Sequence, residues 1–184
     1  YSLFDFEVFG ELASIPAPAA PSDLVATAHL QTQVDLAWTD NSDNETYFII
    51  ERSTDSAFTN PTTITTFANA TGYSDTGLTP GTTYHYRVRA ANGGGESANT
   101  SAAQATTLVN LALSKTAGAS SEYSSSYIAA NAVDGQGATR WSSRYADDEW
   151  FYVDLGATYS VDRVRINWET ACAKDYKIQI ADHP

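Results

Sequence analysis

A short glycine-rich loop offers the oxygen atoms that a hard cation needs. Residues 134–139 have the sequence Asp-Gly-Gln-Gly-Ala-Thr, with a carboxylate at Asp134 and a hydroxyl at Thr139. Calcium takes several oxygen ligands, and some of them are often backbone carbonyls in a tight loop. Glycine lets the backbone turn its carbonyls inward. Asp134 and Thr139 are therefore candidate calcium ligands, although their spacing alone favours an ordinary turn.

Tyr145 is the single aromatic residue of a polar loop. Residues 142–148 have the sequence Ser-Ser-Arg-Tyr-Ala-Asp-Asp. In a carbohydrate site an aromatic ring stacks on the apolar face of a sugar, and a few polar side chains bond its hydroxyls. We therefore expect Tyr145 to be exposed and available to a sugar. Three tryptophans in or beside strand patterns are expected in the core instead: Trp141, Trp150 and Trp168.

No combination of residues in the sequence indicates catalysis. Glycoside hydrolysis needs two carboxylates on opposite sides of a cleft, whereas residues 147–149 form one acidic run on an expected loop. The sequence has no Ser/His/Asp set, zinc-ligand spacing or phosphate-binding glycine loop. Cys172 lacks an evident His or Asp partner, and the histidines are isolated: His29, His85 and His183. We expect no active site.

The elements that position these residues are β-strands. Apolar and polar residues alternate in residues 34–38, 47–51 and 84–90, and turn residues separate these segments. Such alternation predicts half-buried strands, and short strands at this spacing predict a β-sandwich. Residues 11–22 contain three prolines and four alanines, so we expect an extended, semi-rigid linker there.

The segment from Leu78 to Tyr84 identifies this sandwich. Its sequence, Leu-Thr-Pro-Gly-Thr-Thr-Tyr, contains the Leu-x-Pro-x-Thr-x-Tyr signature, and residues 23–108 resemble a fibronectin type III domain. The resemblance implies that Tyr84 is the corner tyrosine, whose hydroxyl bonds to the backbone, and that Trp38 lies in the core.

A second resemblance rests on three segments of the C-terminal half. They are Ala-Ala-Asn-Ala-Val-Asp-Gly at 129–135, Thr-Arg-Trp-Ser-Ser at 139–143 and Glu-Trp-Phe-Tyr-Val-Asp-Leu-Gly at 149–156. Residues 109–184 resemble the N-terminal half of a discoidin-type module (factor 5/8 C-terminal-like, a jelly-roll β-sandwich), within the family 32 carbohydrate-binding modules. Strands are expected at 150–155, 161–168 and 176–180. The fold class we predict is all-β.

The resemblance implies which residues bind ligands. In such modules an Asp and a Thr that match Asp134 and Thr139 hold a structural calcium with backbone oxygens of the loop. A Glu of the closing strand completes that shell in the intact module. Its only match here is Glu7, which belongs to the preceding module, and we expect the third module's own copy to be cut off. Residues that match the sugar-binding positions are Tyr145, Arg140 and Glu169, with Glu122 or Tyr123 as a fourth. A surface ion pair between Arg140 and Glu169 is the structural alternative.

Residues 1–10, Tyr-Ser-Leu-Phe-Asp-Phe-Glu-Val-Phe-Gly, resemble the last strand of a preceding module of the same type. We therefore expect this chain to be a window of a longer protein, with the third module truncated. A half module is expected to expose apolar residues and an unpaired sheet edge.

The composition limits the partners. Ten Lys and Arg stand against 22 Asp and Glu, which gives a formal net charge of −12. Nucleic acid and an acidic membrane surface are therefore not expected as partners, because both require a basic face. With one cysteine the chain has no internal disulfide. We expect a monomer.

The two resemblances together imply a non-catalytic segment of a secreted bacterial polysaccharide-degrading enzyme. The sandwich would be a spacer, and the discoidin-type modules would bind a glucan or a chitosan-like polymer, whose cationic amine would suit the excess of carboxylates. Two alternatives stay open, because fold does not determine function. One is a cell-surface adhesion segment that binds a protein or host glycan, and the other is a segment that is spacer throughout.

Overall fold

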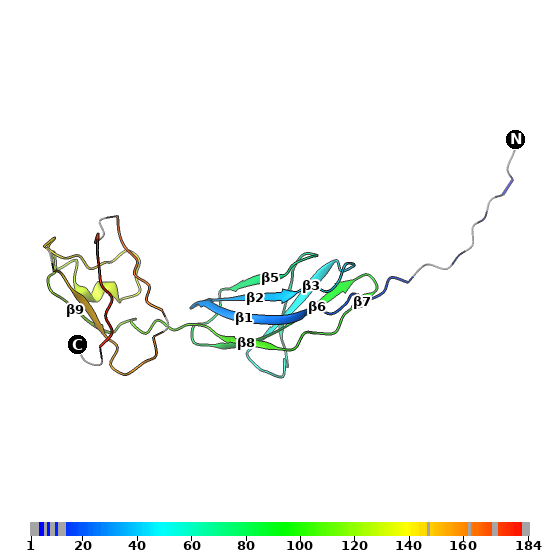
Figure 1. Cartoon of the computed structure of the whole chain (residues 1–184), viewed down its shortest axis with the longest axis horizontal. Coiled ribbons are helices and arrows are strands. Elements are labelled where there is room, and N and C mark those ends of the chain that lie inside the picture. Colours follow the sequence, from blue (N-terminus) through cyan, green and yellow to red (C-terminus); the bar gives the residue numbers. More distant parts are fainter. Residues whose placement is uncertain are drawn as a thin grey trace. The chain divides into compact units, whose positions relative to one another are not determined.

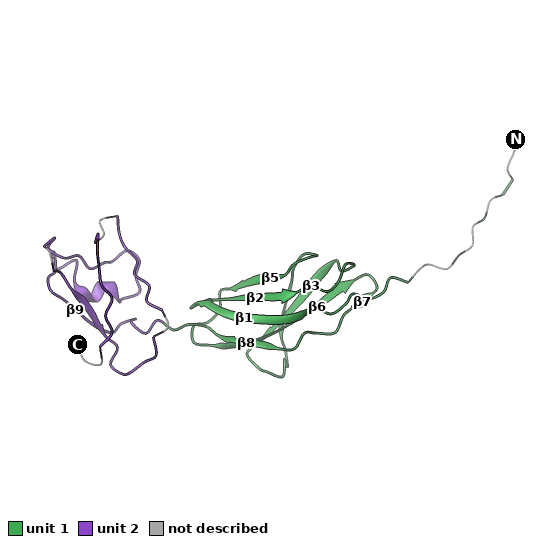
Figure 2. Ribbon diagram, in the orientation of Figure 1, with its two compact units in different colours: residues 1–109 green, residues 110–184 purple. Residues whose placement is uncertain are grey.

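The structure, a computed structural model, describes residues 4, 5, 7, 10, 14–146, 148–161, 163–170 and 173–181. The chain forms two compact units, residues 1–109 and residues 110–184 (Figures 1 and 2). Strands dominate both units, so the predicted all-β class is confirmed. No helix within the described residues is long and apolar enough to span a bilayer.

The first unit is a two-sheet sandwich (Figure 1). One antiparallel sheet has the order β1-β2-β5, from β1 (Ser22–Leu30), β2 (Gln33–Thr39) and β5 (Gly72–Thr76). The other has the order β4-β3-β6-β7, and β8 also pairs with β6. Its strands are β3 (Tyr47–Ser53), β4 (Thr62–Thr65), β6 (Thr83–Asn92), β7 (Gly95–Glu96) and β8 (Ala103–Thr106).

The core of the sandwich comes from residues that alternate along the strands, because successive side chains of a strand point to opposite faces. In β6 every second residue from Tyr84 to Ala90 is buried, and in β3 Phe48 and Ile50 face the same core. Trp38 is buried there, with its ring centroid 5.6 Å from that of Phe48. The strands predicted at 34–38, 47–51 and 84–90 are confirmed as β2, β3 and β6, and so is the core position of Trp38.

Two core tyrosines use their hydroxyl groups differently. The Tyr84 hydroxyl accepts a hydrogen bond of 3.1 Å from the backbone N–H of Thr79, which is the predicted corner. The Tyr86 hydroxyl donates to Oδ2 of Asp75 at 3.0 Å, and the same carboxylate receives Nη1 of Arg52 at 2.8 Å. Asp75 and Tyr86 are both buried, so their bond is closed to water.

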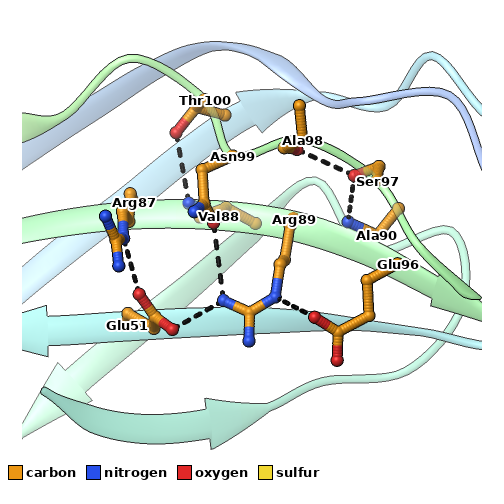
Figure 3. A network of polar contacts seen from close by, with 10 residues as sticks. All are labelled: Glu51, Arg87, Val88, Arg89, Ala90, Glu96, Ser97, Ala98, Asn99 and Thr100. Atoms are coloured by element: carbon orange, nitrogen blue, oxygen red, sulfur yellow. Dashed lines mark hydrogen bonds and ion pairs between the residues drawn. The ribbon is translucent and has the colours of Figure 1, made fainter.

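A polar network covers the outer face of the second sheet (Figure 3). Glu51 of β3 accepts from Nε of Arg87 at 2.5 Å and from Nη1 of Arg89 at 2.7 Å, and Arg89 Nε donates to Glu96 at 2.6 Å. Burial disfavours the charge on Glu51, but the hydrogen bonds from Arg89 and then Arg87 outweigh it and hold the pKa of Glu51 below its ordinary value. Beside this network the Ser97 hydroxyl oxygen accepts a hydrogen bond from the backbone N–H of Ala90 in β6 at 2.9 Å.

The predicted linker is partly docked on the sandwich. Residues 14–20 have no regular secondary structure, but the Pro16 carbonyl accepts from Nδ2 of Asn92 at 2.9 Å and from Nδ2 of Asn44 at 3.2 Å. A Cβ on Gly94 would lie 1.9 Å from the Ile15 carbonyl oxygen, so this close approach requires glycine. The C-terminal part of the Pro/Ala-rich segment thus belongs to the first unit.

The chain enters the sandwich near the first residue of β1 and leaves it near the last residue of β1. Nδ2 of Asn41 binds the Ala20 carbonyl, just before β1 begins, at 2.9 Å. After β8, the N–H of Leu108 donates to the carbonyl of Leu30, the last residue of β1, at 3.3 Å. Nine residues of strand separate these points, which at the usual rise is roughly 30 Å.

The second unit has little regular structure. Its sheet pairs β9 (Thr116–Ala119) with β10 (Phe151–Asp154), and a 3-10 helix, η1 (Ala129–Ala132), lies between them in sequence. Nε1 of Trp141 donates to the Ser121 carbonyl at 2.9 Å, and the rings of Trp141 and Phe151 are 5.3 Å apart. The strand predicted at 150–155 is confirmed.

Two other strand predictions are wrong for the described residues. Residues 161, 163–168 and 176–180 form no strand, because a strand needs a backbone partner and none of the described residues pairs with them. The core positions expected for Trp150 and Trp168 are wrong as well. These side chains are 54% and 42% exposed.

Some predictions concern the chain termini and single residues outside the described ranges. The described residues among the first ten, Phe4, Asp5, Glu7 and Gly10, are exposed and lie outside any strand. Their assignment to a preceding module stays a prediction. Other residues singled out above lie outside the described residues: Asp147, Cys172 and His183.

Candidate functional site

Two loops of the second unit are held together by backbone hydrogen bonds. The N–H of Tyr123 donates to the Ser142 carbonyl at 2.7 Å, and the N–H of Ser142 donates to the Tyr127 carbonyl at 3.3 Å. Nε of Arg144 donates to the Glu122 carbonyl at 3.2 Å. The loop that carries Tyr145 is therefore fixed against the loop of residues 120–128.

Glu149 supports the base of these loops. Its carboxylate accepts hydrogen bonds from the hydroxyls of Ser120 and Ser121. These bonds, with Ser120 first, lower the pKa of Glu149. The Ser121 hydroxyl oxygen in turn accepts from the backbone N–H of Arg144 at 3.0 Å. This residue of the acidic run therefore positions the loop next to Tyr145.

Tyr145 projects from this support. Its side chain is 73% exposed, as the polar residues around it predict, and its backbone is left-handed with φ of 62°. A non-glycine residue in this conformation is uncommon. The ring lies edge-on to that of Tyr123, with centroids 5.5 Å apart, and the ring of Tyr127 lies 6.0 Å beyond Tyr123. Three tyrosine rings thus pack edge-on in one cluster.

Arg140 and Glu169 add two charges to these three rings. The guanidinium carbon of Arg140 lies 4.8 Å from the centre of the Tyr127 ring, and Nη2 of Arg140 is 3.8 Å from Oε1 of Glu169. About half of each side chain is exposed, so this ion pair contributes little to stability. We call the five residues the tyrosine cluster: Tyr123, Tyr127, Arg140, Tyr145 and Glu169.

The structure brings three of the four expected sugar-site residues into this cluster, whereas the carboxylate of the fourth, Glu122, binds a backbone N–H. Glu122 Oε1 accepts from the backbone N–H of Ala129 at 2.7 Å, so this oxygen caps the start of η1. Tyr123, the stated alternative to Glu122, lies at the centre. Sequence reasoning missed Tyr127, whose only signal is its place four residues after Tyr123 in a serine-rich loop.

The cluster has the chemistry of a sugar site. Aromatic faces stack on the C–H face of a pyranose, and the guanidinium and carboxylate beside them can bond hydroxyls. The two carboxylates nearest the cluster are already engaged: Glu149 accepts from two serine hydroxyls, and Glu169 faces Arg140.

The candidate cation loop is closed on itself. Asp134 Oδ2 accepts from the Thr139 hydroxyl at 2.7 Å, and Oδ1 accepts from the N–H of Gln136 at 2.8 Å. These bonds, with Thr139 first, lower the pKa of Asp134. The Thr139 hydroxyl lies 2.9 Å from the Gln136 carbonyl, and Gly135 has φ of 77°.

This loop fits part of a calcium shell. A carboxylate, a hydroxyl and a carbonyl lie within one turn, which is the hard-oxygen donor set that calcium takes. Among the described residues no group of three or more His, Cys, Asp and Glu side chains gathers as a metal site. Calcium here would therefore depend on backbone oxygens. Glu7, the calcium ligand expected for the preceding module, is exposed.

Comparison with protein families finds one match within each of the two units. Residues 19–107 match the family model of the fibronectin type III domain. Residues 131–184 match the NedA-like, galactose-binding domain model of the F5/F8 type C group. The second match includes three members of the tyrosine cluster and both residues of the candidate cation loop. None of the curated proteins compared with the chain matches it.

Solved structures resemble about half of this chain. A Fn3-like protein from Clostridium thermocellum is 33% identical, with 51% of this chain and 97% of that chain covered and a TM-score of 0.43. A beta-1,2-glucanase from Parabacteroides distasonis is 24% identical over 52% of this chain and 13% of that chain, with a TM-score of 0.42.

Proposed function

Because residues 19–107 form a fibronectin type III domain and residues 131–184 match a galactose-binding domain, we propose that this chain is a non-catalytic carbohydrate-binding and spacer segment. The tyrosine cluster carries the proposal, since it presents three rings and two charged groups on one surface. The ligand we propose is a glucan or a chitosan-like polymer. The parent protein would be a secreted glycoside hydrolase.

The sandwich would act as the spacer. A strand of roughly 30 Å separates the points where the chain enters and leaves it, so the sandwich would hold its neighbours apart. A carbohydrate module attached to an enzyme raises the local concentration of the enzyme on its polymer, and two weak modules on one chain add avidity.

Affinity electrophoresis of the whole chain in gels that contain single polysaccharides tests the proposal. Tyr145→Ala should weaken binding to one polymer about tenfold, because a central aromatic anchor commonly contributes more than 1 kcal/mol. Tyr159→Ala is the matched control, since Tyr159 is an exposed tyrosine of the same unit outside the cluster. Equal retardation of the Tyr145→Ala variant and the wild-type chain would refute the site.

Glu169→Gln distinguishes the two classes of polymer. A protonated amine of chitosan would gain from the Glu169 carboxylate, so the substitution and added salt should both weaken chitosan binding. Binding of a neutral glucan should respond little to salt. A response to salt that Glu169→Gln does not change would exclude Glu169 as the partner of the amine.

We propose further that Asp134 and Thr139 hold a calcium ion with carbonyl oxygens of their loop. Ligand binding to the folded state stabilises it, so calcium should raise the thermal midpoint of the second unit and a chelator should reverse the change. Asp134→Ala should abolish this difference. An equal response to calcium in the wild-type chain and in Asp134→Ala would remove the loop from the proposal.

A further inference from the structure

Phe67 is an exposed aromatic residue on the spacer domain. It follows β4, the edge strand of the second sheet, and its side chain is 88% exposed. Exposed phenylalanine is unfavourable in water. The tyrosine cluster of the second unit does not include it, so it is available for a separate role.

The backbone on both sides of Phe67 is anchored. The N–H of Thr66 donates to the Phe48 carbonyl at 3.0 Å. The N–H of Asn69 donates to Oε1 of the buried Glu45 at 2.9 Å. The ring is therefore presented from a short segment that is bound to the sandwich at both ends, which lowers the entropy lost when a ligand binds.

A second aromatic residue lies opposite Phe67. Ile49 pairs with Thr65 in the antiparallel register of β3 and β4. Two residues further along, this register places Tyr47 across from Phe67 on the same outer face. The two rings line a shallow surface pocket with three threonines, namely Thr46, Thr65 and Thr66.

The chemistry of this pocket selects its occupant. Its five lining residues include no ionisable acid or base other than the Tyr47 phenol. The hydroxyls of Thr46 and Thr66 donate to backbone carbonyls, whereas Thr65 lies with the two rings in the alternation of the strands. Aromatic rings with hydroxyls beside them are suited to an uncharged sugar chain. A second copy of the chain is disfavoured, because each copy carries a net charge of −12.

We propose that the fibronectin type III domain itself binds a neutral polysaccharide at Tyr47 and Phe67. The domain is then a second, weak glycan contact, and its avidity adds to that of any other site on the chain. This inference goes beyond the spacer role proposed above and does not depend on Tyr145.

The test is affinity electrophoresis of the whole chain with Phe67→Ala in laminarin, barley β-glucan, starch and dextran gels. Loss of one aromatic contact should weaken binding to one neutral glucan about two- to tenfold. Phe4→Ala is the control, because Phe4 is 98% exposed and remote in sequence. Phe67→Trp should retain or strengthen binding. A melting curve of each variant checks folding.

The outcomes separate this inference from the proposed function. Weaker binding in Phe67→Ala together with unchanged binding in Phe4→Ala supports the second site, whether or not Tyr145→Ala has an effect. Unchanged binding in Phe67→Ala overturns it, even where Tyr145→Ala binds less. A wild-type dimer that Phe67→Ala converts to a monomer also overturns it, as does the absence of retardation in all four gels.

Discussion

Replacing each of two core tyrosines by phenylalanine gives a matched test of how the sandwich is stabilised. Tyr84 and Tyr86 both lie in β6 and in the same core cluster. Both substitutions remove a hydroxyl and leave the ring in place. They differ in the lost partner, which is the backbone N–H of Thr79 for Tyr84 and the Asp75 carboxylate for Tyr86.

The two losses should differ in size. Thr79 is exposed, so water can replace the Tyr84 hydroxyl, and the cost should be about 0.5–1.5 kcal/mol. Asp75 is 3% exposed and Tyr86 is fully buried, so water has little access to the oxygen that loses its partner. A hydrogen bond to a charged group contributes about 1.5–3 kcal/mol.

Calorimetry of the whole chain checks this difference. A change of 1 kcal/mol shifts the midpoint of a domain of this size by about 4–8 °C, so Tyr86→Phe should lower it by about 6–24 °C. Burial, followed by the charge of Asp75, raises the pKa of Tyr86, so its hydroxyl remains a donor from pH 6 to pH 9 and the loss should not vary with pH. A smaller loss for Tyr86→Phe than for Tyr84→Phe would refute the reasoning.

Three further predictions concern charge and close packing. The folded state holds the pKa of Glu51 below its ordinary value of 4.5. The contribution of this carboxylate to the free energy of unfolding is therefore present above that pH and is lost as the pH falls through the lowered pKa. Glu51→Gln should lower the melting temperature at pH 7, and progressively less as the pH falls to 3. Gly94→Ala should release the segment at Ile15, because the new Cβ would lie 1.9 Å from the Ile15 carbonyl oxygen. Faster amide hydrogen exchange at Asn92, whose side chain binds that segment, would show the release. Unchanged exchange would contradict it. Gly118→Ala should destabilise the β9–β10 pair, since its Cβ would lie 2.5 Å from the Tyr152 ring; an unaltered near-ultraviolet circular dichroism spectrum and melting curve would argue against this.

The sandwich could be predicted because short, local sequence patterns indicate its strands and its corner. Alternation along residues 34–38 and 84–90 depends only on neighbouring residues, and so does the Leu78–Tyr84 signature. The docking of the Pro16 carbonyl on Asn92 was not predictable, because these residues are 76 positions apart and neither is unusual in a loop. A proline-rich composition indicates an extended segment but not what it contacts.

The candidate site was predictable in its residue types and less so in its assembly. A polar loop around one ring predicted an exposed Tyr145. Tyr127 joins it only through the hydrogen bonds between two loops, which no local pattern encodes. Likewise, alternation in residues 161–168 indicates strand propensity, but the partner that makes a strand has to come from elsewhere in a sheet.

The position of β1 between the entry and exit points of the sandwich determines how the domain would respond to mechanical force. Tension applied through the two ends of the domain would act along the length of β1 and load its hydrogen bonds to β2 together, in shear, rather than one after another. We expect this domain to stay folded at forces that would open a hairpin whose hydrogen bonds break one after another. Under the proposed function, a glycan contact loaded in flow would be released before the sandwich unfolds, and single-molecule pulling from the two termini would measure the unfolding force of the sandwich.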